Sequence, residues 1–136
     1  MAESQKDLVD WAAQKAEEYL ASAKTNLDEG RLFVAAEEIF RSIENSIEAM
    51  LYARGIKRIA FPSKGKEFTG RLALHFLVRE NLLKAKVISS EDYGKYLNYA
   101  TKLHQAGYNY GSFEENELRQ SLEFAEGLFY RIFSSK

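Results

Sequence analysis

The 136 residues suffice for one domain with a hydrophobic core, spanning residues 1–136, and are too few for two ordinary domains. With 46% apolar and 29% charged residues, one proline and no cysteine, the composition predicts long helices and excludes a disordered chain, disulfides and a cysteine-ligated metal. The net charge of −1 gives no general indication of nucleic-acid binding, so any electrostatic signal must be local.

The first predicted helix covers about residues 4–28. Ser4 and Asp7 form a capping-box pattern, which satisfies free backbone N–H groups at a helix start, and apolar residues then recur at helical spacing. A short turn at Gly30 ends the helix, because glycine adopts the left-handed conformation that other residues resist. So short a turn requires the next helix to fold back antiparallel.

The second predicted helix, residues 31–55, is the one around which we expect the rest of the chain to pack. At 100° per residue its positions divide into a broad apolar face, a neighbouring stripe of small residues and a narrow polar wedge. A helix that is apolar over so much of its circumference belongs at the centre of a bundle. The apolar face is Ala36, Ile39, Phe40, Ile43, Ile47, Met50 and Leu51, the small stripe is Ala35, Ser42, Ser46, Ala49 and Ala53, and the wedge is Glu37, Glu38, Arg41, Glu44, Asn45, Glu48 and Tyr52.

Residues 56–70 are the only clear break in the helical pattern. Pro62 disfavours helix at Phe61, and Gly65 and Gly70 make the chain after the proline more flexible. The region is also rich in cations, which fits either a solvated linker or a phosphate-attracting patch beside the end of the second helix. We call Arg54, Lys57, Arg58, Lys64 and Lys66 the basic segment; Arg71 comes after it, and Glu67 is the single acid in this region.

Three further helices are predicted: residues 67–83, about residues 90–106, and one that begins near residue 112. Ser89 with Asp92, and Ser112 with Glu115, are the capping patterns that open the last two. No stretch alternates apolar and polar residues for long enough to predict a sheet. The predicted fold class is therefore all-α, an antiparallel up-and-down bundle of four to five helices.

Metal and catalytic motifs are missing from this sequence. His75 and His104 are its two histidines, and neither has the acid three residues earlier that di-metal bundles use. There is no Gly-x-Ser-x-Gly turn and no phosphate-binding loop. Glu44 and Glu48 form a carboxylate pair that we assign to a solvated helix face. We therefore assign no catalytic residue, no metal site and no cofactor.

The first candidate ligand site is the end of the fourth helix and the tyrosine-rich loop after it. Lys102, His104, Tyr108 and Tyr110 place aromatic rings beside cations, a combination that stacks on bases and holds phosphates. Tyrosine rings that fill the bundle end and lift their hydroxyls to water explain the same pattern. Both interpretations remain open.

The second candidate ligand site lies on the polar wedge of the second helix. Arg41, Asn45 and Glu48 stand at i, i+4 and i+7, so they line one strip. Either exposed salt bridging or ligand contacts in a groove facing the fourth helix accounts for them.

Three stretches in order resemble the HEPN superfamily (higher eukaryotes and prokaryotes nucleotide-binding). They are LASAKTNLDEGRLFVAA, AAEEIFRSIENSIEAMLYARGI and LHQAGYNYGSFEENELRQSLEFAEGLFYRI, and the similarity extends from about Trp11 to Phe133. The resemblance implies a bundle of four or five helices, usually dimeric, often beside a nucleotidyltransferase partner or within toxin–antitoxin and other defence systems. Catalytic members are metal-independent ribonucleases with an arginine and, four to six residues later, a histidine.

This sequence departs from that ribonuclease motif. No arginine occupies the required positions before His75 or His104; Arg71 and His75 have only three residues between them and lie on a different helix from the motif. The resemblance therefore transfers no catalytic residue. Lys102 and His104 are two residues apart on one helix and point about 200° away from each other, so only a two-fold dimer would bring such groups into a composite site.

The leading functional hypothesis is a non-catalytic HEPN-like bundle that forms a homodimer and binds a partner protein such as a nucleotidyltransferase, a nucleotide or RNA. One alternative is a metal-independent ribonuclease with an altered site built from Lys102, His104, Tyr108 or Tyr110. Another is a structural helical adaptor without a ligand. Nothing in the sequence signals specific DNA binding.

We expect a cytoplasmic protein without membrane contact. No apolar run approaches the roughly 18 residues of a membrane-spanning helix. The N-terminal residues lack the basic start and apolar centre of a signal peptide.

Overall fold

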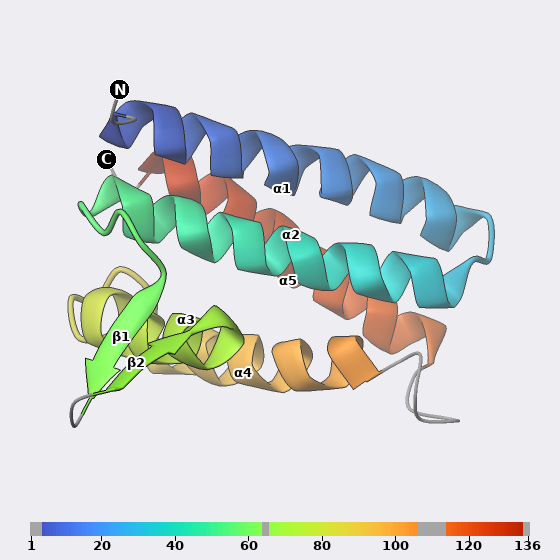
Figure 1. Ribbon diagram of the computed structural model, residues 1–136. Helices are drawn as coiled ribbons and strands as arrows, with labels where there is room; N and C mark the ends of the chain where they lie inside the picture. Colours follow the sequence, from blue (N-terminus) through green and yellow to red (C-terminus); the bar gives the residue numbers. More distant parts are fainter. Residues whose placement is uncertain (1–3, 64–65, 106–113, 135–136) are drawn as a thin grey trace.

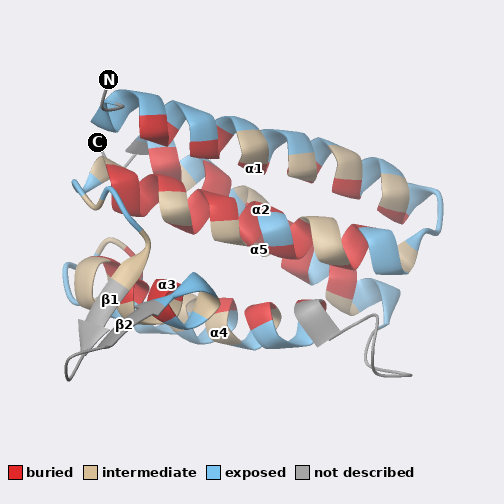
Figure 2. Ribbon diagram, in the orientation of Figure 1, coloured by how far each residue is buried: buried red, intermediate tan, exposed pale blue. Residues whose placement is uncertain are grey.

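A computed structural model describes the backbone of residues 4–63, 66–105 and 114–134, and the side chains of these residues except 61–63, 66–68, 104, 105 and 134. Helix α2 (Leu32–Ala53) lies in the middle of a helical bundle. It packs against α1 (Gln5–Asp28), α4 (Ser90–Gln105) and α5 (Glu115–Ser134) (Figure 1). Ile39, Ile43 and Ile47 are fully buried, and Figure 2 shows α2 as largely buried along its length. The predicted all-α bundle with this helix at its centre is therefore confirmed.

The contact between α1 and α2 is close because both helices present small residues there. Ala12, Ala16 and Ala23 of α1 are fully buried, and so are Ala35, Ser42, Ser46 and Ala49 from the small stripe of α2. The Ser42 hydroxyl donates a hydrogen bond to the Ala16 carbonyl oxygen across the interface, at 3.3 Å. Small side chains allow two helix backbones to approach in this way.

Both ends of α1 agree with the sequence prediction. The Ser4 hydroxyl accepts a hydrogen bond from the Asp7 backbone N–H at 3.1 Å, which caps the helix start. Gly30 has a φ of +80°, the left-handed conformation expected at the turn, and α2 then runs back antiparallel to α1.

The prediction that the chain contains no strands was wrong for residues 60–69. Strands β1 (Ala60–Ser63) and β2 (Lys66–Thr69) pair antiparallel and form a hairpin that projects from the bundle beside α3 (Gly70–Val78) (Figure 1). Neither strand, AFPS or KEFT, alternates apolar and polar residues, which is why the sequence did not reveal them. The third helix consequently begins at Gly70 and not at Glu67, and it continues as a π-helical turn, η1 (Arg79–Leu83).

Helices α4 and α5 complete the bundle. Ser89 and Asp92 form the predicted reciprocal cap: the Ser89 hydroxyl accepts from the Asp92 N–H at 3.0 Å, and the Asp92 carboxylate accepts from the Ser89 N–H at 3.4 Å. Ser112 lies outside the described residues. Among those that are described, no helix has both the length and the apolar character needed to span a membrane. The inner faces of the two helices bury Tyr96, Ala100, Leu103, Leu118, Leu122, Ala125, Leu128, Phe129 and Ile132.

Candidate functional site: a polar pocket between α2 and α3

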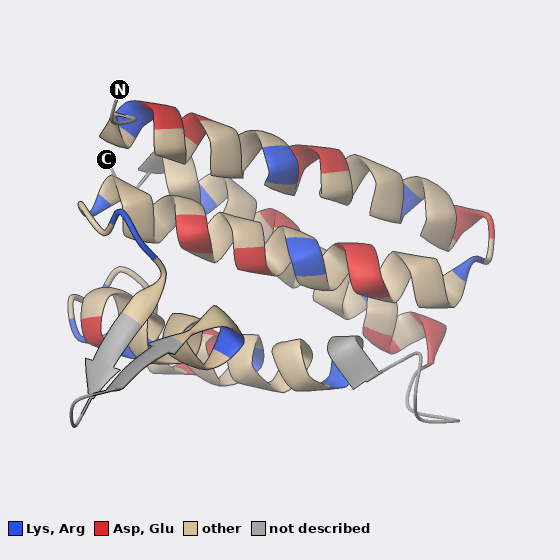
Figure 3. Cartoon of the chain, in the orientation of Figure 1, with Lys and Arg blue, Asp and Glu red and all other residues tan. Residues whose placement is uncertain are grey.

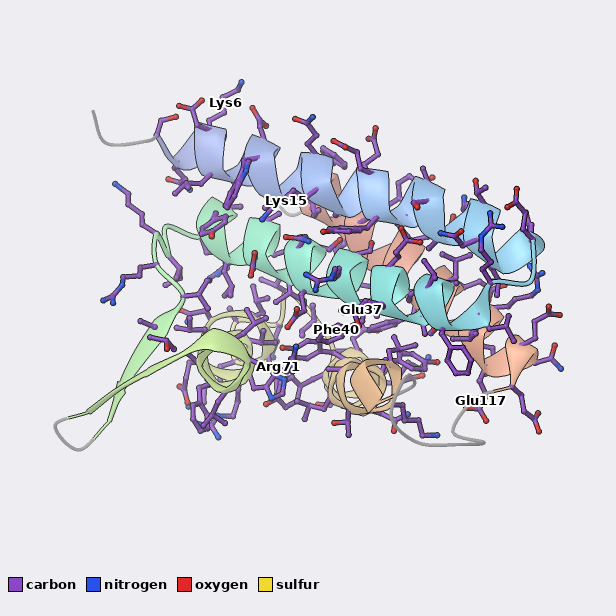
Figure 4. The ribbon with its side chains drawn as sticks, turned by 45° about the vertical axis from the view of Figure 1, so that its right-hand side comes forward. Lys6, Lys15, Glu37, Phe40, Arg71 and Glu117 are labelled. Atoms are coloured by element: carbon purple, nitrogen blue, oxygen red, sulfur yellow. The ribbon has the colours of Figure 1, made fainter. Side chains whose placement is uncertain are left out.

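Arg71 links α3 to the polar wedge of α2. Its Nε lies 3.3 Å from the Glu44 carboxylate, and its guanidinium carbon lies 4.5 Å from the centre of the Phe40 ring. Figure 4 shows Arg71 pointing from α3 towards Phe40 on α2. Arg71, which follows the basic segment in the sequence, therefore forms an ion pair and a cation–π contact within the protein.

The carboxylate pair of α2 lines a pocket rather than a solvated face, which corrects our assignment. Glu44 and Glu48 are both partly buried, because α3 crosses over this part of α2. Together with four neighbours they surround a cavity of about 250 Å³. The lining residues are Glu44, Glu48, Ile59, Gly70, Arg71 and Leu74.

Burial shifts the pKa of both carboxyl groups in the pocket. Burial raises the pKa of Glu44 above its ordinary value, although the charges of Arg71 and Arg41 act in the opposite direction. Burial likewise raises the pKa of Glu48; the charge of Lys15 opposes this shift and that of Glu44 adds to it. Unlike Glu44, Glu48 makes no hydrogen bond or ion pair with any side chain that the structure describes. The pocket thus holds a partly buried carboxylate without a contacting counter-ion in the part of the chain that the structure describes.

His75 and Tyr96 form the inner part of the same polar cluster. Their rings meet edge to face, with centroids 5.3 Å apart. The His75 Nε2 atom and the Tyr96 hydroxyl are both buried without a hydrogen-bond partner among the described residues. Tyr96 is only 1% exposed. Two buried polar atoms without partners are unusual in a packed core, and such atoms require an explanation.

The electrostatics keep both of these rings neutral at physiological pH. Burial, and after it the charge of Arg71, lowers the pKa of His75, so the imidazole carries no charge near pH 7. Burial and then the negative charges of Glu44 and Glu48 raise the pKa of Tyr96. The cluster therefore combines one guanidinium, two carboxylates, a neutral imidazole and a neutral phenol.

This arrangement suits ligand binding better than catalysis. A general acid or base must come within hydrogen-bonding distance of the group it serves, whereas the His75 Nε2 atom is buried away from the surface. In the described part of the chain, no three His, Asp or Glu side chains are grouped so that they could hold a metal ion. What the pocket offers is hydrogen-bond acceptors and negative charge beside apolar walls.

The strip of Arg41, Asn45 and Glu48 does not form one open surface. Arg41 is exposed and pairs with Glu37 within α2, with an N–O distance of 3.1 Å. Asn45 is only 8% exposed, and its amide donates to the Arg41 carbonyl oxygen at 2.8 Å. Tyr52 of the wedge is also buried. Of the strip, only Glu48 contributes to the pocket.

The tyrosine-loop candidate is only partly described. Lys102 is exposed near the end of α4, and its Nζ lies 3.9 Å from the Glu117 carboxylate. The backbone of His104 belongs to α4, but its side chain lies outside the described residues. Tyr108 and Tyr110 also lie outside them. This candidate site therefore stays a prediction.

The basic segment begins where the chain leaves α2. Arg54, Lys57 and Arg58 are exposed, and Figure 3 shows the cationic residues gathered at this end of α2 and in the loop after it. Lys64 lies outside the described residues, and Lys66 is placed only by its backbone in β2.

The sequence contained part of the signal for the pocket. Arg71 and His75 stand four residues apart on one helix, and Tyr96 stands at helical spacing from Ala100 and Leu103. Nothing in the sequence indicated that α3 and α4 bring these side chains to Glu44 and Glu48, because that proximity depends on how the helices cross.

Fold and site together define an all-α protein with a small acidic pocket on its central helix. The sequence pattern of the archaeal PaREP1/PaREP8 family matches residues 12–129, so the chain belongs to this family. No curated protein matches the chain.

Proposed function

We propose that this protein is a non-catalytic, HEPN-like binding module that holds a nucleotide or RNA through its basic segment. The observation that supports this proposal is that two cations after α2 have no acidic partner among the described residues. Arg54 and Lys57 are exposed and form no ion pair with any residue that the structure describes. Several exposed cations elsewhere are paired with acids, among them Lys6–Asp10, Lys84–Glu80 and Lys95–Glu91.

Cations without acidic partners suit a phosphate ligand. A phosphate backbone binds by displacing its counter-ions with Lys and Arg side chains, and a cation already paired with an acid contributes little to this. The cations after α2 therefore form a local positive surface on a chain whose net charge is −1.

Fluorescence anisotropy with a labelled short RNA tests this proposal. The double variant Arg54→Gln/Lys57→Gln is expected to weaken binding by about tenfold or more and to reduce the salt dependence by about 0.7 per lost phosphate contact. The matched control is Lys84→Gln/Lys95→Gln, which removes two paired cations and is expected to bind like the wild type. Absence of RNA and nucleotide binding in the wild type at low salt would refute the proposal.

The second part of the proposal is a homodimer that docks a partner protein. Two pairs of apolar side chains are exposed within the described residues, Phe33 and Val34 near the start of α2 and Tyr130 and Phe133 on α5. Phe33 is 70% exposed, and isolated monomers seldom leave large aromatic groups so open together. Light scattering should give a dimer mass for the wild type and a monomer mass for Phe33→Ser or Tyr130→Ser; a monomeric wild type contradicts this part.

We further propose a nucleotidyltransferase as the partner, in a toxin–antitoxin or defence setting. Co-purification with the product of an adjacent nucleotidyltransferase reading frame tests it. The ribonuclease alternative makes a different prediction: RNA is cut in excess chelator, and His104→Ala abolishes the cutting. Retention of cutting in that variant would exclude the Lys102, His104, Tyr108 and Tyr110 site.

A further inference from the structure

Helices α1 and α5 form a face with an aromatic groove. The groove has a volume of about 390 Å³, and the buried side chains of Leu20 and Phe129 line it. The Phe129 ring meets the rings of Tyr130 and Phe133 edge on, with centroids 5.8 and 5.4 Å apart. Tyr130 is 67% exposed and Phe133 is 52% exposed. Two large rings thus lie open to solvent beside an apolar hollow, a feature typical of an interaction surface.

The charges of the two helices match each other along this face. Helices α1 and α5 run antiparallel (Figure 1). The Arg119 Nη1 atom lies 3.4 Å from a carboxylate oxygen of Asp28, and the Lys24 Nζ atom lies 3.2 Å from one of Glu126. The exposed fractions of these four side chains range from 29% to 71%. Each charge can therefore also interact with an opposite charge that approaches from outside the chain.

Two-fold symmetry makes such a face complementary to itself. A two-fold axis that runs along the groove places α1 of one copy over α5 of the other. This rotation preserves the position along the axis, so residues that are level within one chain are also level between the two copies. Lys24 then faces Glu126 of the partner subunit, and Asp28 faces Arg119 of the partner subunit. The opposite charges that meet within each chain thus meet again between the chains.

The same rotation gives Tyr130 a place to insert. Glu17 on α1 and Tyr130 on α5 line the groove together, so they are level with each other. The Glu17 carboxylate is exposed and forms no ion pair with a described residue. Each Tyr130 ring therefore lies over the groove of the other copy, where its hydroxyl can donate a hydrogen bond to Glu17. A hydrogen bond to a carboxylate is among the stronger ones.

We propose that two copies of this chain pack through the α1–α5 face, with the two-fold axis along the groove and Tyr130 of each copy inserted into the groove of the other. This interface rests on the homodimer proposed above and specifies its surface. The exposed rings of Tyr130 and Phe133 form its apolar centre, and the charges of Lys24 and Glu126 lie at its rim. An apolar centre with a polar rim is the usual anatomy of a protein interface.

Exchanging the charges of Lys24 and Glu126 tests the proposal. Lys24→Glu and Glu126→Lys each place like charges opposite one another between the copies, so each variant alone should dimerise about tenfold or more weakly than the wild type. In an equimolar mixture, Glu at position 24 of one variant faces Lys at position 126 of the other, and both contacts of the mixed dimer are again attractive. Sedimentation velocity at low salt should show that mixing restores the dimer.

Two controls accompany this exchange. Lys95 and Glu91 form an ion pair of 3.2 Å on α4, so Lys95→Glu and Glu91→Lys, alone or mixed, should dimerise like the wild type. Circular dichroism should show that all four variants keep their helix content. Because mixing restores no contact within a chain, a folding defect cannot produce the recovery.

Tyr130→Ser checks the apolar centre of the interface. Loss of an inserted ring should weaken the dimer by about tenfold or more. Trp11→Ser is the matched control, since Trp11 is also 53% exposed but lies about 120° around α1 from Glu17. Its dimer should be as stable as that of the wild type. Equal effects of the two changes would contradict the insertion of Tyr130.

The outcomes separate this interface from the homodimer itself. A dimeric wild type whose affinity neither charge reversal changes would overturn the interface and leave the homodimer standing. Two weakened variants whose mixture stays as weak as each alone would do the same, because the charges would then act only within the chain. A monomeric wild type would overturn both proposals and leave the α1–α5 face to a different partner.

Discussion

Glu48 shows how a single partly buried charge can lower the stability of a fold. Its carboxylate is partly buried, has no contacting cation among the described residues, and has a raised pKa. A raised carboxyl pKa in the folded state means that the folded protein takes up the proton more readily than the unfolded chain. The charged form is therefore destabilising above the folded-state pKa, and this cost disappears as the pH falls through that value.

Glu48→Gln is consequently expected to stabilise the protein near neutral pH. Thermal unfolding should give a Tm a few degrees above wild type at pH 7, and the difference should shrink towards zero below the ordinary glutamate pKa near 4. Glu123→Gln, at an exposed position, should leave Tm nearly unchanged at both pH values. A Glu48→Gln protein less stable than wild type at pH 7 would mean that the carboxylate is stabilised by a contact we have not identified.

At the scale of elements, the α1–α2 contact depends on side-chain size. Ala16 is fully buried against α2, where the Ser42 hydroxyl bonds to its carbonyl oxygen. Ala16→Leu should therefore destabilise the fold by about 1–3 kcal/mol, because the helices have no room for the larger group. Ala21→Leu is the matched control on the exposed face of α1 and should change stability by less than about 0.5 kcal/mol. Urea unfolding measures both; equal effects would contradict the close packing.

The connection from hairpin to α3 depends on glycine. Gly70 has a φ of +68°, and a Cβ built there meets no atom within 4 Å, so the conformation and not crowding is the constraint. Gly70→Ala should cost about 1 kcal/mol, whereas Gly94→Ala inside α4 should stabilise by about 0.5–1 kcal/mol. Chemical denaturation distinguishes the two, and a stabilising Gly70→Ala would show that the turn has another geometry.

At the scale of the whole molecule, the sequence predicted the architecture better than the site. The apolar face of α2 covers so much of its circumference that only a central position buries it, and the fully buried Ile43 confirms this. The hairpin was missed because neither of its two strands alternates apolar and polar residues. The pocket was missed because the burial of Glu44 depends on where α3 crosses α2, and sequence periodicity contains no information on such crossings.

The central claim is that the core helix α2 holds two carboxylates in a pocket rather than in open solvent. The most direct measurement is an NMR titration of the side-chain carboxyl groups of Glu44 and Glu48. The account predicts that both carboxyl groups titrate above the ordinary glutamate value, because burial raises the pKa of each. Titration of both groups at or below the ordinary value would contradict it.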